Sequence, residues 1–421
     1  MHIDCPDLTT RLAAAVALAA AAAGASAQTG PYAGGSVSYT HDSNVYRLAD
    51  GAEPPPGTPR SDRITSASLM AGLRLPLGRQ VLSADASLRS TRYADHSSLD
   101  HHGHRVALGL DWATVERLTG SASVSRERTL VRFDSDAALS GASTLERNLA
   151  TITHAEAVAR IGLVTRWSAE LGATADAVDY SADAFRPRDF RQSGVSAGVR
   201  HRASDALSTG LALRAARGRY PHFAQVADGS DIADRYHGRY VDWDVRWVPG
   251  DVSRIDARLS LGRTTFDRAT ASDVSGATGQ LLWTWRPTAA LRLETRLARE
   301  RGQDSSALYF PGSGRYADFS RTTTSLGTAA YLQLTAKVQL VAGLAGAKRQ
   351  LVDTRQDLAG ATTLRTGDDR TRVASLGVRW QPLRTVTLGC DVTHEQRTHT
   401  GALSTDYHAS TQGCHAQLVL N

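Results

Sequence analysis

The sequence predicts an all-β fold: a transmembrane antiparallel up-and-down β-barrel of about eighteen strands, with short periplasmic turns and long extracellular loops. Three observations predict it. Apolar and polar residues alternate with period two, the connections alternate between short and long, and tryptophans gather at the short connections. The chain has 421 residues, of which 41% are hydrophobic and 21% charged, with net charge +6 and three cysteines. This composition excludes a disordered tail, a small disulfide scaffold and a bundle of transmembrane helices.

The N-terminal segment is predicted to be a secretory signal peptide. Arg11 precedes an apolar run from Leu12 to Gly24, and small residues lead up to Ala27. The run is too short to span a bilayer, and its small-x-small ending is typical of a cleavage site. We therefore expect residues 1–27 to be removed, and residues 28–421 to form one barrel in the outer membrane of a Gram-negative cell.

The strands are predicted from windows in which every second residue is apolar. The clearest are residues 106–112, 241–247, 255–261 and 291–297. In residues 241–247, valine and tryptophan alternate with aspartate and arginine. Each window therefore describes a strand with one apolar and one polar face.

The predicted connections fall into two classes that alternate along the chain. The short ones lie near Pro76-Leu77-Gly78, Ala113 to Arg117, Val164 to Trp167, Ala203 to Ala206, Pro249-Gly250-Asp251, Pro287-Thr288-Ala289, Thr335-Ala336-Lys337 and Pro382-Leu383. The long polar ones cover Asp42 to Asp62, Ala94 to Gly103, Val131 to Glu146, Ala182 to Phe190, Gly218 to Arg235, Gly302 to Phe319 and Val352 to Asp369. This layout is typical of an outer-membrane barrel, whose long loops are also able to fold into the lumen.

Five of the seven tryptophans lie at or beside short connections. An indole ring prefers apolar surroundings while its N–H prefers water, and a membrane interface offers both. A soluble barrel with tryptophans at its strand ends is the alternative, but it would need an interior for many one-sided strands. We therefore expect a girdle at the membrane interface made of Trp112, Trp167, Trp247, Trp285 and Trp380.

Cys390 and Cys414 are the two cysteines of the predicted mature chain. They lie at equal distances from position 402 and on the apolar phase of the last two predicted strands, which makes them cross-strand neighbours. In an oxidising compartment we expect a disulfide between them. Two free thiols remain the alternative, because a directly opposed pair can be strained.

The polar face of the strands is predicted to line the lumen. Only Lys337 and Lys348 among the 48 basic residues are lysines, so 46 are arginines. Guanidinium groups would suit an acidic polymer, but a biased base composition explains the excess equally well. Strand arginines often share the polar phase with carboxylates, and the candidate lumen-lining residues are Asp242, Asp244, Arg246, Asp256, Arg258, Arg292, Glu294 and Arg296.

Two clusters were weighed as chemical sites. His41 and Ser43 have a spacing similar to that of outer-membrane lipid hydrolases, in which histidine activates serine. A turn at the end of the first strand is the simpler interpretation of this segment. His101, His102 and His104 lack an acidic or thiol partner at useful spacing, so a solvated loop is favoured over a metal site. No catalytic residue, metal or cofactor is predicted, and the chain is predicted not to be an enzyme.

Several short motifs resemble the β-barrel porins of exopolysaccharide operons, the EpsL-type outer-membrane proteins of exosortase-associated systems. The likeness runs from about Tyr32 to the C-terminus, and the motifs are Tyr39 to Leu48, Tyr93 with Leu99 to Gly103, Leu110-Asp111-Trp112, Glu146-Arg147-Asn148, and Tyr407-His408-Ala409 with Gly413 to Gln417. The resemblance implies a role in making or exporting a surface polysaccharide. It carries over no catalytic residues.

Three functions therefore compete at this stage. The first is a passive outer-membrane channel for exopolysaccharide export that works with periplasmic export proteins. The second is a general diffusion porin for small solutes, and the third is a lipid hydrolase using His41 and Ser43. All three place the chain against outer-membrane lipid, and nothing beyond a pI of about 9.4 suggests nucleic acid.

Overall fold

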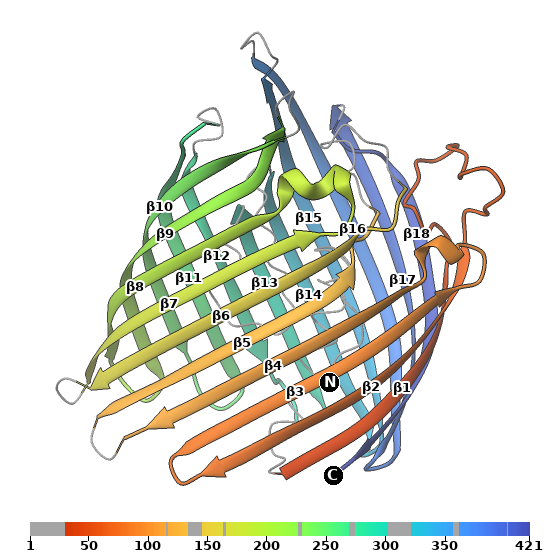
Figure 1. Ribbon diagram of the computed structural model, residues 1–421. Coiled ribbons are helices and arrows are strands. Elements are labelled where there is room, and N and C mark those ends of the chain that lie inside the picture. Colours follow the sequence, from red (N-terminus) through yellow and green to blue (C-terminus); the bar gives the residue numbers. More distant parts are fainter. Residues whose placement is uncertain are drawn as a thin grey trace.

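The computed structural model describes residues 30–114, 117–133, 145–162, 166–225, 230–268, 274–301, 321–356, 362–401 and 403–421. These residues form eighteen strands and two short 3-10 helices (Figure 1). The predicted signal peptide lies outside the described residues. The elements are β1 (Gly30–Asp42), β2 (Asp62–Leu77), β3 (Gln80–Tyr93), η1 (Ser97–Leu99), β4 (His101–Ala113), β5 (Leu118–Leu130), β6 (Leu149–Gly162), β7 (Trp167–Tyr180), η2 (Asp183–Arg188), β8 (Phe190–Arg202), β9 (Leu207–Gln225), β10 (Asp231–Trp247), β11 (Ser253–Phe266), β12 (Val274–Trp285), β13 (Leu291–Arg301), β14 (Arg321–Thr335), β15 (Val338–Gln356), β16 (Thr362–Leu383), β17 (Val386–Gly401) and β18 (Tyr407–Leu420).

The strands form one closed sheet. Each strand pairs antiparallel with its neighbours in sequence, and β1 also pairs with β18, so the sheet has no free edge. At this seam Ala33 lies opposite Leu420 and Asp42 lies opposite Thr411. The structure thus confirms the predicted eighteen-strand antiparallel barrel. Closure matters physically because it leaves no row of unpaired backbone groups exposed to lipid.

The wall has an apolar outer face and a polar inner face. Along β10, Val241 and Trp243 are 42% and 50% exposed, whereas the intervening Asp242 is 5% exposed. The same alternation leaves large apolar side chains on the outside of nearly every strand, including Leu69 and Leu344, which are about 70% exposed. An outer belt of this kind is suited to lipid and would be unfavourable in water.

The two ends of the barrel differ in the length of their connections (Figure 1). Tight turns join β2 to β3 and β10 to β11, where Gly78 and Gly250 have positive φ angles of 64° and 73° that favour glycine. The first loop runs over residues 43–61, as the sequence predicts. Because β1 begins and β18 ends at the short-turn end, that end corresponds to the periplasmic side of an outer-membrane barrel.

Several predicted boundaries are wrong in the same way. The predicted loops at 218–235 and 352–369 are mostly strand, because β9 and β10 leave only residues 226–230 between them and β15 and β16 leave only 357–361. The predicted turn at Pro382-Leu383 still belongs to β16. At the long-loop end the strands continue beyond the apolar belt, where the regular alternation of apolar and polar residues disappears, although the strands remain paired through their backbones.

No helix among the described residues has the length and apolar character needed to cross a membrane.

Candidate functional site

The interior of the barrel is the candidate functional site, because charged side chains from many strands converge there. The register places all eight predicted lumen-lining residues on the inward phase of their strands, namely Asp242, Asp244, Arg246, Asp256, Arg258, Arg292, Glu294 and Arg296. Each of them is ion-paired in the described part of the structure. The inner wall is therefore a lattice of mixed charge.

Asp242 is the centre of one buried part of this lattice. Arg214 on β9 donates from Nε to its Oδ2 at 2.8 Å, and Arg258 on β11 lies 2.5 Å from the same oxygen. The Ser260 hydroxyl donates to Oδ1 at 2.6 Å. The Arg214 guanidinium also lies 4.0 Å from the centre of the Tyr240 ring. Charge-assisted bonds from both neighbouring strands therefore fix one carboxylate of β10.

A second chain of ion pairs runs around the wall from β6 to β10. Arg160 donates to Glu170 at 2.8 Å, Arg200 lies 3.6 Å from the same carboxylate, and Arg200 then reaches Asp244 at 2.7 Å. The last contact passes over β9 at Gly210, where a Cβ atom would stand 2.6 Å from Asp244 Oδ1. Glycine at position 210 therefore leaves the space in which the Arg200–Asp244 ion pair crosses β9.

The remaining predicted residues form pairs that are exposed around Asp256 and largely buried at Glu294 and Arg296. Arg246 and Arg254 contact Asp256 at 3.1 Å and 2.6 Å, and Arg292 lies 3.4 Å from Glu294. Arg296 pairs with Glu300 at 3.1 Å. Because positive and negative groups neutralise one another along the wall, its charge composition alone does not select anions.

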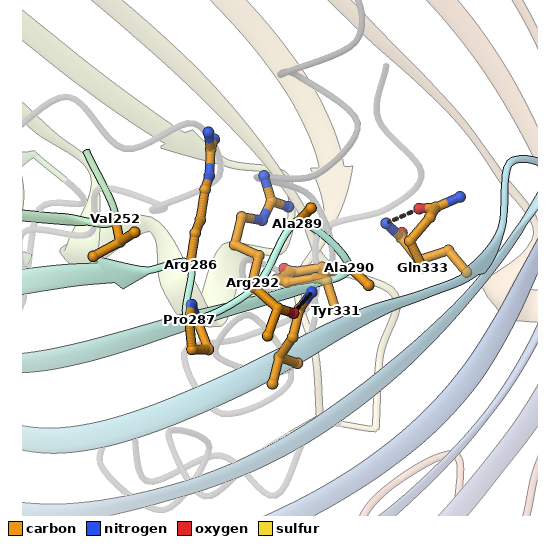
Figure 2. A pocket seen from close by; sticks show the side chains of 11 residues that line it. Val252, Arg286, Pro287, Ala289, Ala290, Arg292, Tyr331 and Gln333 are labelled. Atoms are coloured by element: carbon orange, nitrogen blue, oxygen red, sulfur yellow. Dashed lines mark hydrogen bonds between the residues drawn. The ribbon is translucent and has the colours of Figure 1, made fainter.

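A recess of about 570 Å³ lies inside the barrel beside the short turn between β12 and β13. Figure 2 shows Arg286 and Arg292 extending in the same direction from this turn, with the Tyr331 ring beside Arg292. The guanidinium carbon of Arg292 lies 4.4 Å from the centre of that ring. The Tyr331 hydroxyl is buried and has no hydrogen-bond partner among the described residues. Gln333 and Gln339 complete the polar lining.

The first loop folds inward at the opposite mouth. Asn44 is 1% exposed, and its amide nitrogen donates to the carbonyl oxygens of Leu48 and His408. Tyr46 packs edge-on against Phe133 with ring centres 4.7 Å apart. Val45, Tyr46 and Leu99 form a small buried apolar cluster. The cluster joins the first loop to η1 and to Phe133 after β5, so the loop is packed against its neighbours at this mouth.

An ionic contact ties this loop to β17, two strands from β1 in the barrel. Arg47, whose φ angle is 51°, lies 2.8 Å from Asp42 and 3.6 Å from Glu395 of β17. Arg132, just after β5, forms an ion pair with the same Glu395, which also accepts from the Tyr407 hydroxyl at 2.8 Å. The strands β18, β1, β2, β3 and β4 separate β5 from β17. Residues 131–133 therefore fold across the mouth and narrow it.

The sequence offers no local signal for this contact. Arg132 and Glu395 are 263 residues apart, and each lies in a segment with several other polar residues. Burial of Glu395 is the unusual feature of this contact. It cannot be predicted from the sequence, because the positions that flank Glu395 in the strand are also polar.

The predicted tryptophans lie around the short-turn end. Trp167, Trp247, Trp285 and Trp380 are between 37% and 49% exposed on the outer face. Trp112 is half-buried and lies over Gly120 of β5, whose Cβ would stand 2.3 Å from the indole. Their location at a membrane interface stays a prediction.

The predicted disulfide is present. Cys390 and Cys414 lie directly opposite each other on β17 and β18 and are bonded, with Cα atoms 4.0 Å apart. Both residues are exposed on the outer face of the barrel. The bond therefore clips the closing hairpin from its lipid-facing side.

The two weighed clusters do not assemble a chemical site in the described structure. No hydrogen bond joins His41 to Ser43 among the described residues, and the Ser43 hydroxyl oxygen accepts from the Ser410 amide at 2.8 Å. The prediction of a solvated loop at His101, His102 and His104 is wrong, because all three lie in β4. Successive strand residues point to opposite faces, which separates His101 from His102. No group of three or more metal-ligating side chains occurs in the part of the chain that is described.

Comparison with solved structures identifies similar barrels. Pseudomonas aeruginosa OccK2 (OpdF) is 13% identical over 93% of this chain and 100% of its own, with a TM-score of 0.50. The outer membrane protein OpdK of the same organism is also 13% identical, over 93% of this chain and 98% of its own, with a TM-score of 0.47. Acinetobacter baumannii OccAB4 is 10% identical over 94% of this chain and 99% of its own, with a TM-score of 0.47. At these identities the likeness shows the fold alone.

No protein-family model matches the sequence, and no curated protein matches it either. The resemblance to EpsL-type proteins of exopolysaccharide operons is therefore not supported by the comparisons, and the polysaccharide role stays a prediction.

Proposed function

We propose that the chain is an outer-membrane channel through which small polar solutes diffuse. The lipid-suited outer belt and the charged inner wall support this function, because together they separate a membrane-facing surface from a water-compatible passage. The similarity in fold to OccK2 (OpdF) is consistent with it. The proposal includes secretion through a signal peptide cleaved near Ala27 and an interfacial tryptophan girdle at the short-turn end.

The narrowed mouth is the observation that carries the choice of small solutes. Arg47 and Arg132 approach Glu395 from two inward-folded segments, and Glu395 is only 2% exposed. A small solute needs only a gap beside such a contact, whereas an extended polymer needs a continuous wide opening. The geometry therefore favours a diffusion channel over polysaccharide export.

Conductance in planar bilayers tests the proposal. The purified full chain should form stable channels, and Arg132→Ala should raise the single-channel conductance because it releases the contact across the mouth. Arg128→Ala is the matched control, because Arg128 lies on the outer face of β5, the strand that Arg132 follows. Absence of channels in the wild-type protein would refute the function. Equal conductance of both variants would refute the role of the mouth contact.

The competing functions have separate readouts. If the chain exports a polymer, deletion of its gene should retain polysaccharide in the periplasm, whereas we expect secretion to be unchanged. If it is a lipid hydrolase, Ser43→Ala should abolish hydrolysis, whereas we expect the wild-type protein to show none.

A further inference from the structure

A cluster of basic side chains lies on the outer face of the barrel, above the apolar belt. We call it the basic patch and define it by Arg217 and Arg219 of β9, Arg235, His237 and Arg239 of β10, and Arg263 of β11. All six occupy the outward phase of their strands and are exposed. On each strand they lie beyond the outward-facing residues of the apolar belt, nearer the long-loop end.

The register brings the members of the basic patch close together. Arg239 lies directly opposite Arg263, Arg235 lies opposite Arg219, and His237 lies opposite Arg217. Opposed residues of antiparallel strands have Cα atoms about 5 Å apart, and alternate residues of one strand are separated by about 7 Å. Several guanidinium groups can therefore reach one anionic headgroup.

Like charges directly opposite each other destabilise a sheet unless something neutralises them. No carboxylate among the described residues is ion-paired with Arg217, Arg219, Arg235 or Arg239. The contrast with the inner wall of the same strands is sharp, since Asp242 there is neutralised by two arginines. These four arginines thus lack the carboxylate partners that the arginines around Asp242 have.

The wall behind the patch is rigid. Inward-facing Tyr220, Tyr236 and Phe266 pack together, with ring centres 5.4 to 6.5 Å apart. Tyr236 is fully buried and donates to Gln192 at 3.0 Å. The spacing of the arginines is therefore fixed by the backbone beneath them, which lowers the entropy lost on binding a ligand.

Directly below the patch lies the surface that contacts acyl chains. On β10 the outward row continues from Arg239 to Val241 and Trp243, and on β9 Leu213 is 66% exposed. A ligand that satisfies both regions has phosphate groups at the level of the arginines and hydrocarbon chains beneath them. Arginine is well suited to the first part because its planar fork binds phosphate through two hydrogen bonds.

We propose that the basic patch binds the phosphorylated glucosamine lipid of the outer leaflet, lipid A, through its phosphate groups. This inference rests on the proposed location in the outer membrane but not on transport. The patch lies on the outside of the wall, so it anchors the barrel to a lipid at the β9–β11 side without entering the passage.

The test compares two double variants of the full chain in detergent. Arg235→Gln with Arg239→Gln removes two charges of the patch. Arg126→Gln with Arg128→Gln removes two outward arginines in the same alternate spacing on β5, where they are flanked by Val106 and His104 instead of arginine. Retention of the folded, fast-migrating form on gels is checked for both variants.

Binding is measured by native mass spectrometry with diphosphorylated lipid A. At about 5-fold per arginine near an anionic lipid surface, the patch variant should bind roughly 25-fold more weakly than wild type. The β5 variant should stay close to wild type, dephosphorylated lipid A should bind weakly, and inorganic phosphate should not displace lipid A. Equal affinity of the two variants, undiminished binding of dephosphorylated lipid A, or full displacement by inorganic phosphate would each overturn the proposal.

Conductance of the same variants separates this proposal from the transport function. We expect both to conduct like wild type, since the substituted residues face outward. A chain that binds lipid A as described but forms no channel refutes only the transport function, and a conducting chain that fails the binding arms refutes only the lipid site.

Discussion

Replacing Asp242 with asparagine removes a buried charge of the inner wall while preserving side-chain size. Asp242 is 5% exposed, and the side chains of Arg214 and Arg258 are 13% and 15% exposed. Asparagine removes the carboxylate charge that both guanidinium groups contact. Removing one partner of a buried ion pair costs about 3–5 kcal/mol. We expect a loss near the lower limit, because the arginines keep some contact with water.

The same substitution at Asp256 is the matched control. Asp256 also pairs with two arginines of the inner wall, but the side chains of Arg246 and Arg254 are 60% and 51% exposed. Exposed pairs contribute about 0–1 kcal/mol, so Asp256→Asn should lower the free energy of unfolding by less than about 1 kcal/mol. The two substitutions are chemically identical and differ in the burial of their partners.

Urea unfolding of the barrel in lipid vesicles measures both losses by linear extrapolation. A third variant, Asp242→Asn with Arg258→Met, should recover part of the stability because one uncompensated charge is removed with its partner. Equal losses for Asp242→Asn and Asp256→Asn would falsify the claim that burial decides the strength of this lattice.

Three further predictions follow from single features. Replacing Cys390 and Cys414 with alanine should lower the free energy of unfolding by roughly 3 kcal/mol, because the disulfide closes a loop with a sequence separation of 24. Urea unfolding measures this loss, and an unchanged unfolding midpoint would contradict the prediction. Tyr331→Phe should change stability by less than about 1 kcal/mol, because the lost hydroxyl has no described partner, whereas a loss of several kcal/mol would reveal one. The side-chain hydrogen bond from His399 lowers the pKa of Asp406, so this bond stabilises the last loop above the ordinary carboxyl pKa and is lost as the pH falls through the lowered value. The His399 amide, which donates to Asp406 at 2.6 Å, should therefore lose hydrogen-exchange protection as the pH falls from the ordinary carboxyl pKa of about 4 through the lowered value, and constant protection corrected for intrinsic rates would refute this.

The fold was predictable because lipid imposes a one-sided pattern on every strand. Residues at outward positions must be apolar, as at Leu211, Leu213, Val241 and Trp243. The inward residues between them are free to be polar. The prediction failed where that constraint ends. Residues 218–225 of β9 rise beyond the belt, so their strand character depends on pairing with β10 and is invisible in the hydropathy pattern.

The sequence predicted which residues face inward but not which residues they contact. Polar phase alone identified Asp242 and Asp244 as lumen-lining residues. Their partners Arg214 and Arg200 lie 28 and 44 residues away, and choosing them requires the register of three neighbouring strands. The contact of Arg132 with Glu395 requires the closed barrel as well, so no property of either local sequence indicates it.

The seam between β1 and β18 sets the order in which the barrel can close. Asn44 donates to the carbonyl of His408, and the Ser43 amide donates to the carbonyl of Ser410, so the first loop is held by the last strand of the chain. These contacts span more than 360 residues, and their loop-closure entropy is recovered only when the last hairpin docks. The narrowing of the mouth and the sealing of the wall are thus one assembly event, and an incomplete chain forms neither.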